Sequence, residues 1–304
     1  MTEAEILERL KKRVRWPLNS PLIRGIGDDC AIYRARGAAE DLLLTTDLLI
    51  EGTHFLTSTH RPFDIGHKAL ARGLSDIASM GGQARFCLLS LGLPKEVDPK
   101  WIDSFYSGLL KLAATHGAWL AGGDLARSPH ITCDIVCGGG VPRGKALLRN
   151  GASRDDEIYV SGRLGGSALG LATNRGPARQ RHLRPQPRLE LGQYLRQRLH
   201  ATAAMDLSDG LSIDLARLCE ASGVSANIDV LPLFPGATLE QALHGGEDYE
   251  LLFTVRPGTR VPRSFREIPL TRIGKILAGS RGRVWLGGLP LAVLGHDHFR
   301  HDPS

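Results

Sequence analysis

The chain has 304 residues, a formal net charge of +6 and a pI near 9.2, with 42% hydrophobic and 23% charged residues. These values are ordinary for a globular enzyme, and the length favours two domains over one. No apolar run reaches the ~18 residues of a membrane-spanning helix, and the N-terminus has no signal-peptide core, so a membrane protein is excluded and a cytoplasmic location is predicted.

Neither the positive charge nor the cysteines predict a nucleic-acid-binding or zinc-binding protein. Seven arginines lie between residues 175 and 198, but no nucleic-acid-binding motif is present and aromatic residues make up only 6% of the chain. A solvated helix face, or an attraction for phosphorylated small molecules, fits better. The five scattered cysteines lack zinc-ligand spacing, and we expect reduced, mostly buried thiols.

The hydrophobic pattern of the first half predicts a sheet with helices. An amphipathic helix begins at the N-terminus, where Thr2 and Glu5 have the spacing of a capping box. Apolar runs predict strands at residues 42–46, 86–93, 119–121 and 131–137. Helical spacing of apolar residues predicts helices at 63–80, ended by Gly81 and Gly82, and at 101–116.

The pattern restarts near residue 150. Predicted strands follow at 158–162, 226–230, 251–255 and 283–286, and predicted helices at 165–173, 188–199 and 211–221. The alternation of strands and helices indicates an α/β (α+β) protein. We place a domain boundary near residue 150, which gives domains of residues 1–150 and 151–304.

Six short acidic motifs set carboxylates beside Gly, Ser or Thr, mostly at the ends of apolar runs. Hard oxygen ligands from separate segments suit Mg²⁺, which usually takes one or two carboxylates together with substrate phosphate oxygens. A carboxylate cluster also needs a multivalent cation to offset repulsion, although any single motif fits ordinary turn chemistry. The motifs are Gly27-Asp28-Asp29, Thr45-Thr46-Asp47, Ser75-Asp76, Gly122-Gly123-Asp124, Asp206-Leu207-Ser208-Asp209-Gly210 and Gly245-Gly246-Glu247-Asp248.

Phosphoryl transfer is the chemistry most consistent with these motifs. The chain lacks the Walker A pattern, the protein-kinase signatures, the G-x-S-x-G elbow and the H-E-x-x-H zinc motif. Metal-assisted phosphoryl transfer needs charge neutralisation and alignment, with little covalent work by the protein. The glycine-rich turn at 162–166 could bind phosphate at a helix N-terminus, or it could be only a tight turn.

In the order of its motifs the chain resembles the thiamine-monophosphate kinases. That family shares its fold with aminoimidazole-ribonucleotide synthetase and selenophosphate synthetase. The resemblance covers nearly the whole chain, from Gly25 to Phe299. Its most specific segments are Thr45-Thr46-Asp47 with Gly52-Thr53-His54-Phe55, then His182-Leu183-Arg184-Pro185, and Gly245-Gly246-Glu247-Asp248-Tyr249-Glu250-Leu251.

The resemblance implies transfer of the γ-phosphate of ATP onto thiamine monophosphate, giving thiamine diphosphate. It implies the two-domain aminoimidazole-ribonucleotide synthetase-like fold, a homodimer in which N-terminal domains pair their sheets, and an α/β C-terminal domain that closes the cleft. Several Mg²⁺ ions would be bound through Asp29, Thr45, Thr46, Asp47, Asp76, Asp124, Asp206 and Asp209. Gly123, Asp124, Arg149, Ser208 and Tyr106 would contact ATP, and His54, Glu247 and His296 would contact the organic substrate. No general base is expected, because an acceptor phosphate is largely ionised at neutral pH.

Two other functions stay open at this stage. An aminoimidazole-ribonucleotide synthetase-like ligase would keep the metal cluster and change the segments at 52–55 and 245–251. A non-catalytic nucleotide-binding or metal-binding homodimer would have lost metal carboxylates, and none is missing. Selenophosphate synthesis is disfavoured, because no cysteine precedes Cys30.

Several site residues also have a purely structural interpretation. His54 could be a structural histidine, Ser208 could cap the helix that follows Gly210, and Asp28 could only cap a turn. Two features depart from the family pattern. His296 stands where the family commonly has an aromatic residue, and the segment at 231–243 looks short.

Overall fold

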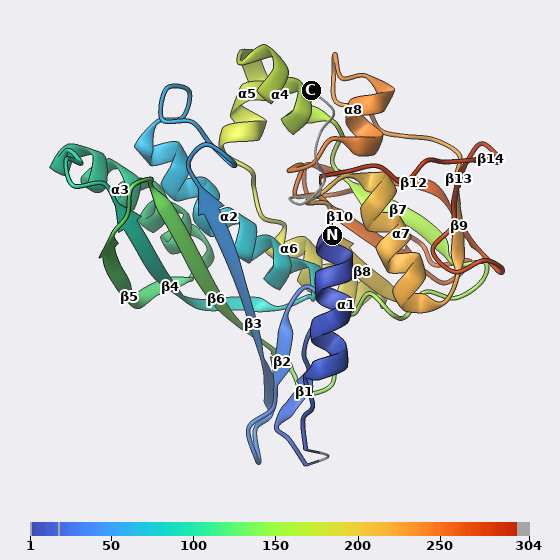
Figure 1. The fold of residues 1–304 in the computed structure, drawn as a ribbon. Helices are drawn as coiled ribbons and strands as arrows, with labels where there is room; N and C mark the ends of the chain where they lie inside the picture. Colours follow the sequence, from blue (N-terminus) through green and yellow to red (C-terminus); the bar gives the residue numbers. More distant parts are fainter. Residues whose placement is uncertain (1, 18, 297–304) are drawn as a thin grey trace.

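The strands form two sheets, which divide the chain between residues 142 and 157 (Figure 1). The computed structural model describes residues 2–17 and 19–296, so residues 297–299 of the family resemblance lie outside the described part. The first sheet has the strand order β1-β2-β3-β6-β4-β5. The second has the order β14-β13-β9-β12-β7-β10-β8, with β11 paired to β12. The chain passes from the first sheet to the second in the region where the hydrophobic pattern of the sequence restarts.

The strands of the first sheet are β1 Leu22–Arg24, β2 Ala31–Tyr33, β3 Glu40–Ile50, β4 Gln83–Leu93, β5 Trp119–Arg127 and β6 Thr132–Pro142. Those of the second are β7 Glu157–Ser161, β8 Ala203–Asp206, β9 Ser225–Ile228, β10 Leu251–Val255, β11 Ser264–Phe265, β12 Ile268–Leu277, β13 Val284–Leu286 and β14 Leu289–Pro290. The helices are α1 Glu3–Arg13, α2 Pro62–Ser79, α3 Pro99–His116, α4 Gly166–Thr173, α5 Gly176–Leu183, α6 Leu189–Tyr194, the π-helical turn η1 Leu195–Leu199, α7 Leu211–Ser222 and α8 Leu239–His244. Across the described ranges, no helix combines the length and apolar character needed to cross a bilayer.

Helix α2 lies at the centre of the molecule (Figure 1). It packs on β3, β4 and β6 of the first sheet and also contacts α6 and β8 of the second half. Against α3 the two backbones touch: a Cβ added at Gly66 would lie 2.0 Å from the Phe105 carbonyl oxygen, and one at Gly108 would lie 1.9 Å from that of Phe63. Because only glycine permits this approach, the two helices form one rigid layer beneath the sheet.

The second half shares its core with the first. Strand β10 is buried along its whole length: Leu251, Phe253 and Val255 join the core cluster of the first sheet, and Leu252 joins that of the second. Period-two alternation explains the division, since successive side chains point to opposite faces of a strand. Strand β10 therefore connects the two cores and holds the halves together.

Most long elements were predicted. The capping box of Thr2 and Glu5 is present at α1, and the predicted helices at 63–80, 101–116 and 211–221 correspond to α2, α3 and α7. Strand β5 extends beyond the predicted 119–121 to Arg127, and the predicted helix at 188–199 is α6 followed by the π-helical turn η1. The strands β1, β2, β8, β11, β12 and β14 and the helices α5 and α8 were missed.

All five cysteines are free and buried, as expected. Burial raises the pKa of Cys133 to about 12 and that of Cys219 to about 12, so these thiols stay protonated at neutral pH. Cys133 and Cys137 lie on the same face of β6, as their spacing predicts. Both side chains pack in the core of the first sheet.

Candidate active site

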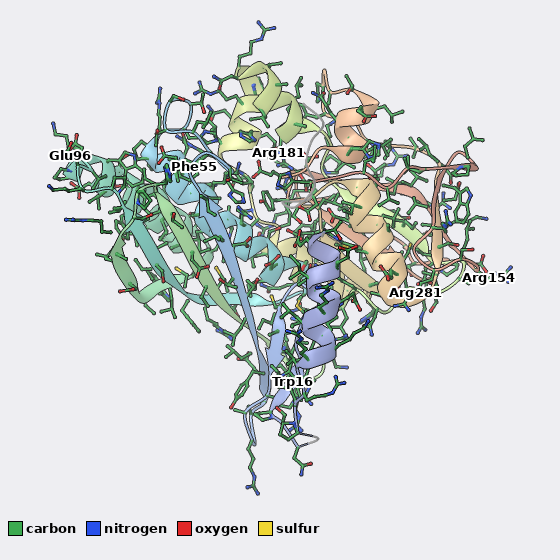
Figure 2. All side chains as sticks on the ribbon, in the orientation of Figure 1. Trp16, Phe55, Glu96, Arg154, Arg181 and Arg281 are labelled. Carbon is green, nitrogen blue, oxygen red and sulfur yellow. The ribbon has the colours of Figure 1, made fainter. Side chains whose placement is uncertain are left out.

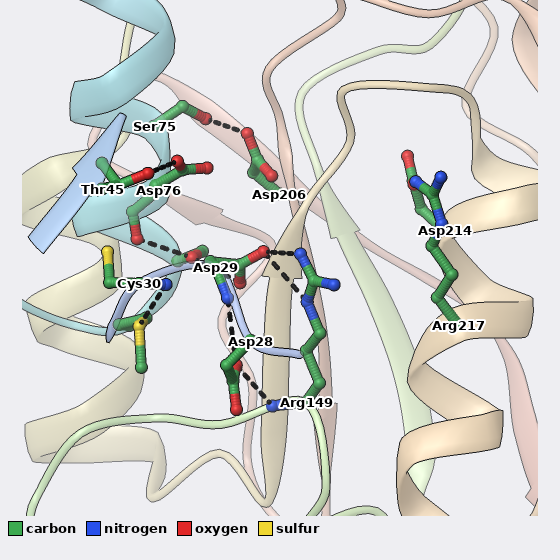
Figure 3. A network of polar contacts seen from close by, with 12 residues as sticks. Asp28, Asp29, Cys30, Thr45, Ser75, Asp76, Arg149, Asp206, Asp214 and Arg217 are labelled. Atoms are coloured by element: carbon green, nitrogen blue, oxygen red, sulfur yellow. Dashed lines mark hydrogen bonds and ion pairs between the residues drawn. The ribbon is translucent and has the colours of Figure 1, made fainter. Parts of the chain in front are cut away.

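Three acidic side chains from distant segments meet between the two halves (Figure 3). Asp29 lies in the turn before β2, Asp76 on α2 and Asp206 at the end of β8. One carboxylate oxygen from each lies within 4.8 Å of the other two. Asp29 and Asp206 are 8% and 2% exposed, so this carboxylate cluster is largely removed from solvent.

Each carboxylate of the cluster accepts a hydrogen bond from a hydroxyl group (Figure 3). Ser79 Oγ donates to Asp29 over 2.8 Å, and Ser75 Oγ donates to Asp206 over 2.6 Å. The hydroxyl of Thr45 donates to Asp76.

Arg149 supplies a positive charge to one member of the cluster. Its Nε donates to Asp29 over 3.0 Å, and its Nη2 bonds the same oxygen. The neighbouring Asp28 was left out of the predicted site, and its carboxylate accepts from the backbone N–H groups of Asp29 and Arg149. The Asp28 side chain is 0% exposed, and burial and the charge of Asp29 raise its pKa to about 6.

The electrostatics of the cluster require a compensating charge. Burial, together with the carboxylates of Asp47, Asp206 and Asp29, raises the pKa of Asp76 well above its ordinary value. Burial and Asp29 do the same to the pKa of Asp206. Either protons or a multivalent cation must offset this repulsion. The donors are hard oxygens of carboxylates and hydroxyls, so they fit Mg²⁺.

Helix α2 carries charged residues at four-residue spacing along one face. Lys68 bonds Glu247, Arg72 bonds Asp47 with an N–O distance of 3.0 Å, and Asp76 joins the carboxylate cluster. Residues four apart lie one above the other on a helix. Helix α2 therefore contacts, in order along its axis, the carboxylate of Glu247, that of Asp47 on β3, and the carboxylate cluster.

Glu247 lies in a strained loop that is held by backbone hydrogen bonds. Its φ of 63° and that of Tyr249, 48°, are left-handed values that non-glycine residues seldom adopt. Glu247 N donates to Ser208 O over 2.7 Å and Tyr249 N to Leu207 O over 2.9 Å, which fixes the loop against the segment after β8. Strain of this kind persists where the surroundings over-determine it, often at a functional site.

The charge of Glu247 is also fixed. Lys68 Nζ donates to its Oε2 over 2.7 Å, and His182 Nδ1 lies 3.3 Å from the same oxygen. Burial raises the pKa of Glu247, but Lys68, His182 and Arg72 outweigh it and hold the pKa at about 2. Burial and Lys68 lower the pKa of His182 to about 4, so its ring is neutral at neutral pH.

Asp209 and His296 lie together near the start of α7. His296 N donates to the backbone oxygen of Asp209 over 3.1 Å, and the Asp209 carboxylate pairs with Arg217. Asp214 Oδ2 accepts from Asp209 N and Gly210 N, at 3.0 and 3.1 Å. Asp214 therefore holds the turn that precedes α7, and the N-cap residue of α7 is Gly210, so the structural interpretation of Ser208 as a helix cap is wrong.

Two predicted residues have contacts apart from the carboxylate cluster. His54 Nδ1 accepts from Ile50 N over 3.1 Å, which fixes the turn after β3. Tyr106, on α3, packs against Phe105 and the core of the first sheet, with Cys133 nearby. The proposed substrate role of His54 and the proposed ATP role of Tyr106 stay predictions.

Asp124 and Thr46 lie on the far side of the sheet from the cluster. Asp124 is opposite Ser90 on β4, which is opposite Asp134 on β6. The Thr46 hydroxyl donates to Asp134 over 2.6 Å, whereas Asp47 next to it points to α2. A shallow hollow of about 230 Å³ lies over this side and is lined by Ser90, Leu91, Gly92, Asp124, Ala126, Ser128, Thr132 and Asp134.

Gly123 precedes Asp124 and has a positive φ of 152°. A Cβ there would lie 1.8 Å from the carbonyl oxygen of Leu89, so β5 needs glycine to approach β4. The structure gives Gly123 a packing role.

The glycine-rich turn at 162–166 already binds a side-chain carboxylate of the same chain. The Asp248 carboxylate accepts from Gly165 N and from Ser167 N, the latter over 3.0 Å. These are the amides at the N-terminus of α4 that a phosphate would use. Phosphate binding at this turn is therefore not supported. The glycines instead allow the chain to make a tight turn.

Sequence reasoning missed several residues of the site. Lys68, Arg72, Ser79 and Arg217 were given no role, and His182 was noted only within a family motif. The spacing of Lys68, Arg72 and Asp76 on one helix face was a readable signal. The partners of these residues come from the other half of the chain and could not be read from spacing.

The fold and the carboxylate site define an AIR synthase related protein. The model of the AIR synthase related protein N-terminal domain matches residues 27–141, and that of the C-terminal domain matches residues 153–287. A structure of the hydrogenase maturation protein HypE in complex with ATP has the same fold, with a TM-score of 0.69 at 17% identity, and covers 95% of this chain and 90% of that one.

Within that class the chain belongs to the thiamine-monophosphate kinase family. It is 40% identical over 303 residues to the thiamine-monophosphate kinases of Salmonella typhimurium and Escherichia coli K12, covering 90% of this chain and 91% of each relative. The Bacillus subtilis enzyme is 33% identical over 306 residues, with 91% and 93% covered.

Solved structures agree with this assignment. A structure of AaThiL complexed with AMPPCP and TMP superposes with a TM-score of 0.86 at 33% identity, covering 98% of this chain and 97% of that one. The thiamine-monophosphate kinase of Stenotrophomonas maltophilia has a TM-score of 0.78 at 36% identity, covering 94% and 96%.

Proposed function

We propose that this protein transfers the γ-phosphate of ATP to thiamine monophosphate and forms thiamine diphosphate. The relatives named thiamine-monophosphate kinase and the AaThiL complex with AMPPCP and TMP support this activity. The observation that carries the proposal is the alignment, along α2, of the carboxylate cluster with the ionised Glu247. The carboxylate cluster would bind the phosphates through metal ions, and Glu247 would bind the organic cation of the same phosphorylated thiamine. The ligase interpretation has no such support.

The residues of the cluster would hold several Mg²⁺ ions. Asp29, Asp76 and Asp206 provide the carboxylate oxygens, with Thr45 and Asp47 beside them. Bound Mg²⁺ would neutralise the repulsion between the two phosphate-bearing substrates. Metal binding by Thr46, Asp124 and Asp209 belongs to the same proposal.

The rest of the chain orients the reactants. Arg149 would exchange part of its bonding to Asp29 for an ATP phosphate, and Ser208, in the turn before α7, would also contact ATP. ATP contacts by Gly123, Asp124 and Tyr106 are further parts of the proposal. On the organic side, Glu247, His54 and His296 would contact thiamine monophosphate. The acceptor phosphate is largely ionised at neutral pH, so the chain needs no general base.

We also propose a homodimer, with residues 1–150 as the metal-binding and pairing domain and residues 151–304 closing the cleft. Leu48 and Leu88 are 47% and 37% exposed on the side of the first sheet that carries Asp124 and Asp134. Apolar residues of this kind favour a protein interface. The free, buried cysteines fit a reducing compartment, and we propose the cytoplasm.

The test is to incubate the purified protein with ATP and thiamine monophosphate, and to follow thiamine diphosphate with and without MgCl₂. Product that depends on both substrates and on Mg²⁺ is expected. Absence of product under every metal condition would contradict the proposal. Thiamine without its phosphate serves as the control acceptor and should yield no thiamine diphosphate.

A further inference from the structure

A buried ion pair links the two halves beside the cluster. Lys68, on α2, is 0% exposed, and its ammonium group bonds Glu247 from the loop before β10 over 2.7 Å. Lysine is rarely buried to this degree without a partner. The Glu247 side chain is 27% exposed, so the carboxylate is the open member of the pair and the lysine is the closed one.

Two histidines lie behind the same carboxylate. His182 is 4% exposed and His60 is 6% exposed, and their rings meet edge to face with centroids 5.3 Å apart. His182 Nδ1 lies between Ser167 Oγ at 3.0 Å and Glu247 Oε2 at 3.3 Å. The bond from Lys68 therefore holds one oxygen of Glu247 from behind, with the His182 ring beside it, and the other oxygen of this partly exposed side chain stays open to a ligand.

The position of the pair is set by α2. Lys68 and Asp76 are eight residues apart on one face of the helix, which corresponds to about 12 Å along its axis. A molecule whose phosphate lies at the carboxylate cluster would have its organic end near Glu247. An ionised carboxylate repels a second phosphate and favours N–H donors or a cation, so the open oxygen suits the amino-bearing, cationic end of the substrate.

We propose that Lys68 is a positioning residue for the organic substrate, because it holds Glu247 ionised and aimed at the amino-bearing or cationic end of thiamine monophosphate. The role rests on the proposed function. Joining the two halves does not depend on Lys68 alone, because Arg184 and Asp64 form another ion pair between the second half and α2. Arg181, on α5 with His182, is labelled in Figure 2, and it pairs with Glu250 within the second half.

The experiment compares wild type with K68M, K68R and the matched control R184M. We expect K68M to raise KM for thiamine monophosphate on the order of tenfold or more, since it leaves Glu247 without its partner charge. The KM for ATP should stay within about twofold, and K68R should recover part of the loss because it keeps the charge. R184M should lower Tm and leave both KM values near wild type.

A double-mutant cycle with E247Q tests whether Lys68 acts through Glu247. If it does, adding K68M to E247Q raises KM for thiamine monophosphate by much less than K68M does alone. An unchanged KM in K68M, or an equal rise in KM for ATP, would overturn the proposal. So would Lys68 variants that fail to fold while R184M folds, because Lys68 would then be structural. A wild-type protein that forms no thiamine diphosphate would instead sink the proposed function.

Discussion

The carboxylate of Asp76 is crowded by Asp29, Asp47 and Asp206, and this crowding determines how the site responds to substitution. Thr45 donates a hydrogen bond to Asp76, and an amide oxygen can accept it equally well. A change to Asn therefore keeps the shape and the hydrogen bond and removes one negative charge. Function and metal-free stability should then change in opposite directions.

We predict that D76N abolishes turnover and raises the Tm of the metal-free protein by a few degrees, because it relieves like-charge repulsion. It should also lose most of the Tm increase that MgCl₂ gives the wild type, since ligand binding stabilises the folded state only where a site remains. Differential scanning fluorimetry with and without MgCl₂ measures both effects. D103N, at an exposed position on α3, is the matched control and should behave as wild type. A lower Tm in metal-free D76N would refute the crowding argument.

At this scale the sequence predicted the acids and missed what orients them. Asp29, Asp76 and Asp206 were each recognisable beside small residues, and they meet as expected. The hydroxyl of Ser79 bonds Asp29, fifty residues away, and no local pattern encodes that pair. Thr46 and Asp47 are adjacent yet face opposite sides of β3, which period-two alternation predicts and a motif does not.

Among the secondary-structure elements, α2 is the one on which the site depends. It carries Lys68, Arg72 and Asp76, and its position is fixed by backbone contact with α3 at Gly66 and Gly108. A methyl group at this contact must push the helices apart. Overpacking of this kind destabilises a well-packed core without removing any functional group.

We predict that G108A lowers the free energy of unfolding by about 1–3 kcal/mol, because its Cβ would overlap the Phe63 carbonyl. Urea denaturation followed by circular dichroism measures the loss. S107A, the exposed neighbouring position on α3, should change stability by less than about 0.5 kcal/mol. Stability equal to wild type in G108A would show that α2 and α3 can separate freely, against the close contact at this crossing.

The elements that were not predicted have a weak hydrophobic pattern in the sequence. Strand β12 contains Pro269 and Gly274 and has a register shift between Arg272 and Gly274, so its alternation is interrupted. Helix α5 is rich in basic residues and has a weak apolar face. Long amphipathic helices such as α2 and α3 have an uninterrupted apolar face. Their predicted ends therefore lie within about two residues of the observed ends.

For the whole molecule, the position of Asp124 decides how many chains build one site. It lies on β5, three strands from β3, a distance of about 14 Å at ordinary strand spacing. It also shares a sheet face with Asp134, opposite to the face where Asp47 meets Arg72. Within one chain Asp124 therefore stays apart from Asp47. If both bind the same set of ions, Asp124 has to come from the partner in a homodimer.

We predict that two inactive variants, D76N and D124N, restore activity when combined in one dimer. In a mixed dimer one site would lack both acids and the other would be intact, so activity should be about half that of wild type. Co-expression with two different affinity tags isolates the mixed dimer, and thiamine diphosphate formation measures its activity. Homodimers of each variant are the controls. If Asp124 serves the site of its own chain, both sites of the mixed dimer carry one lesion each and it stays inactive. A protein that elutes as a monomer at working concentration would rule out the shared site altogether.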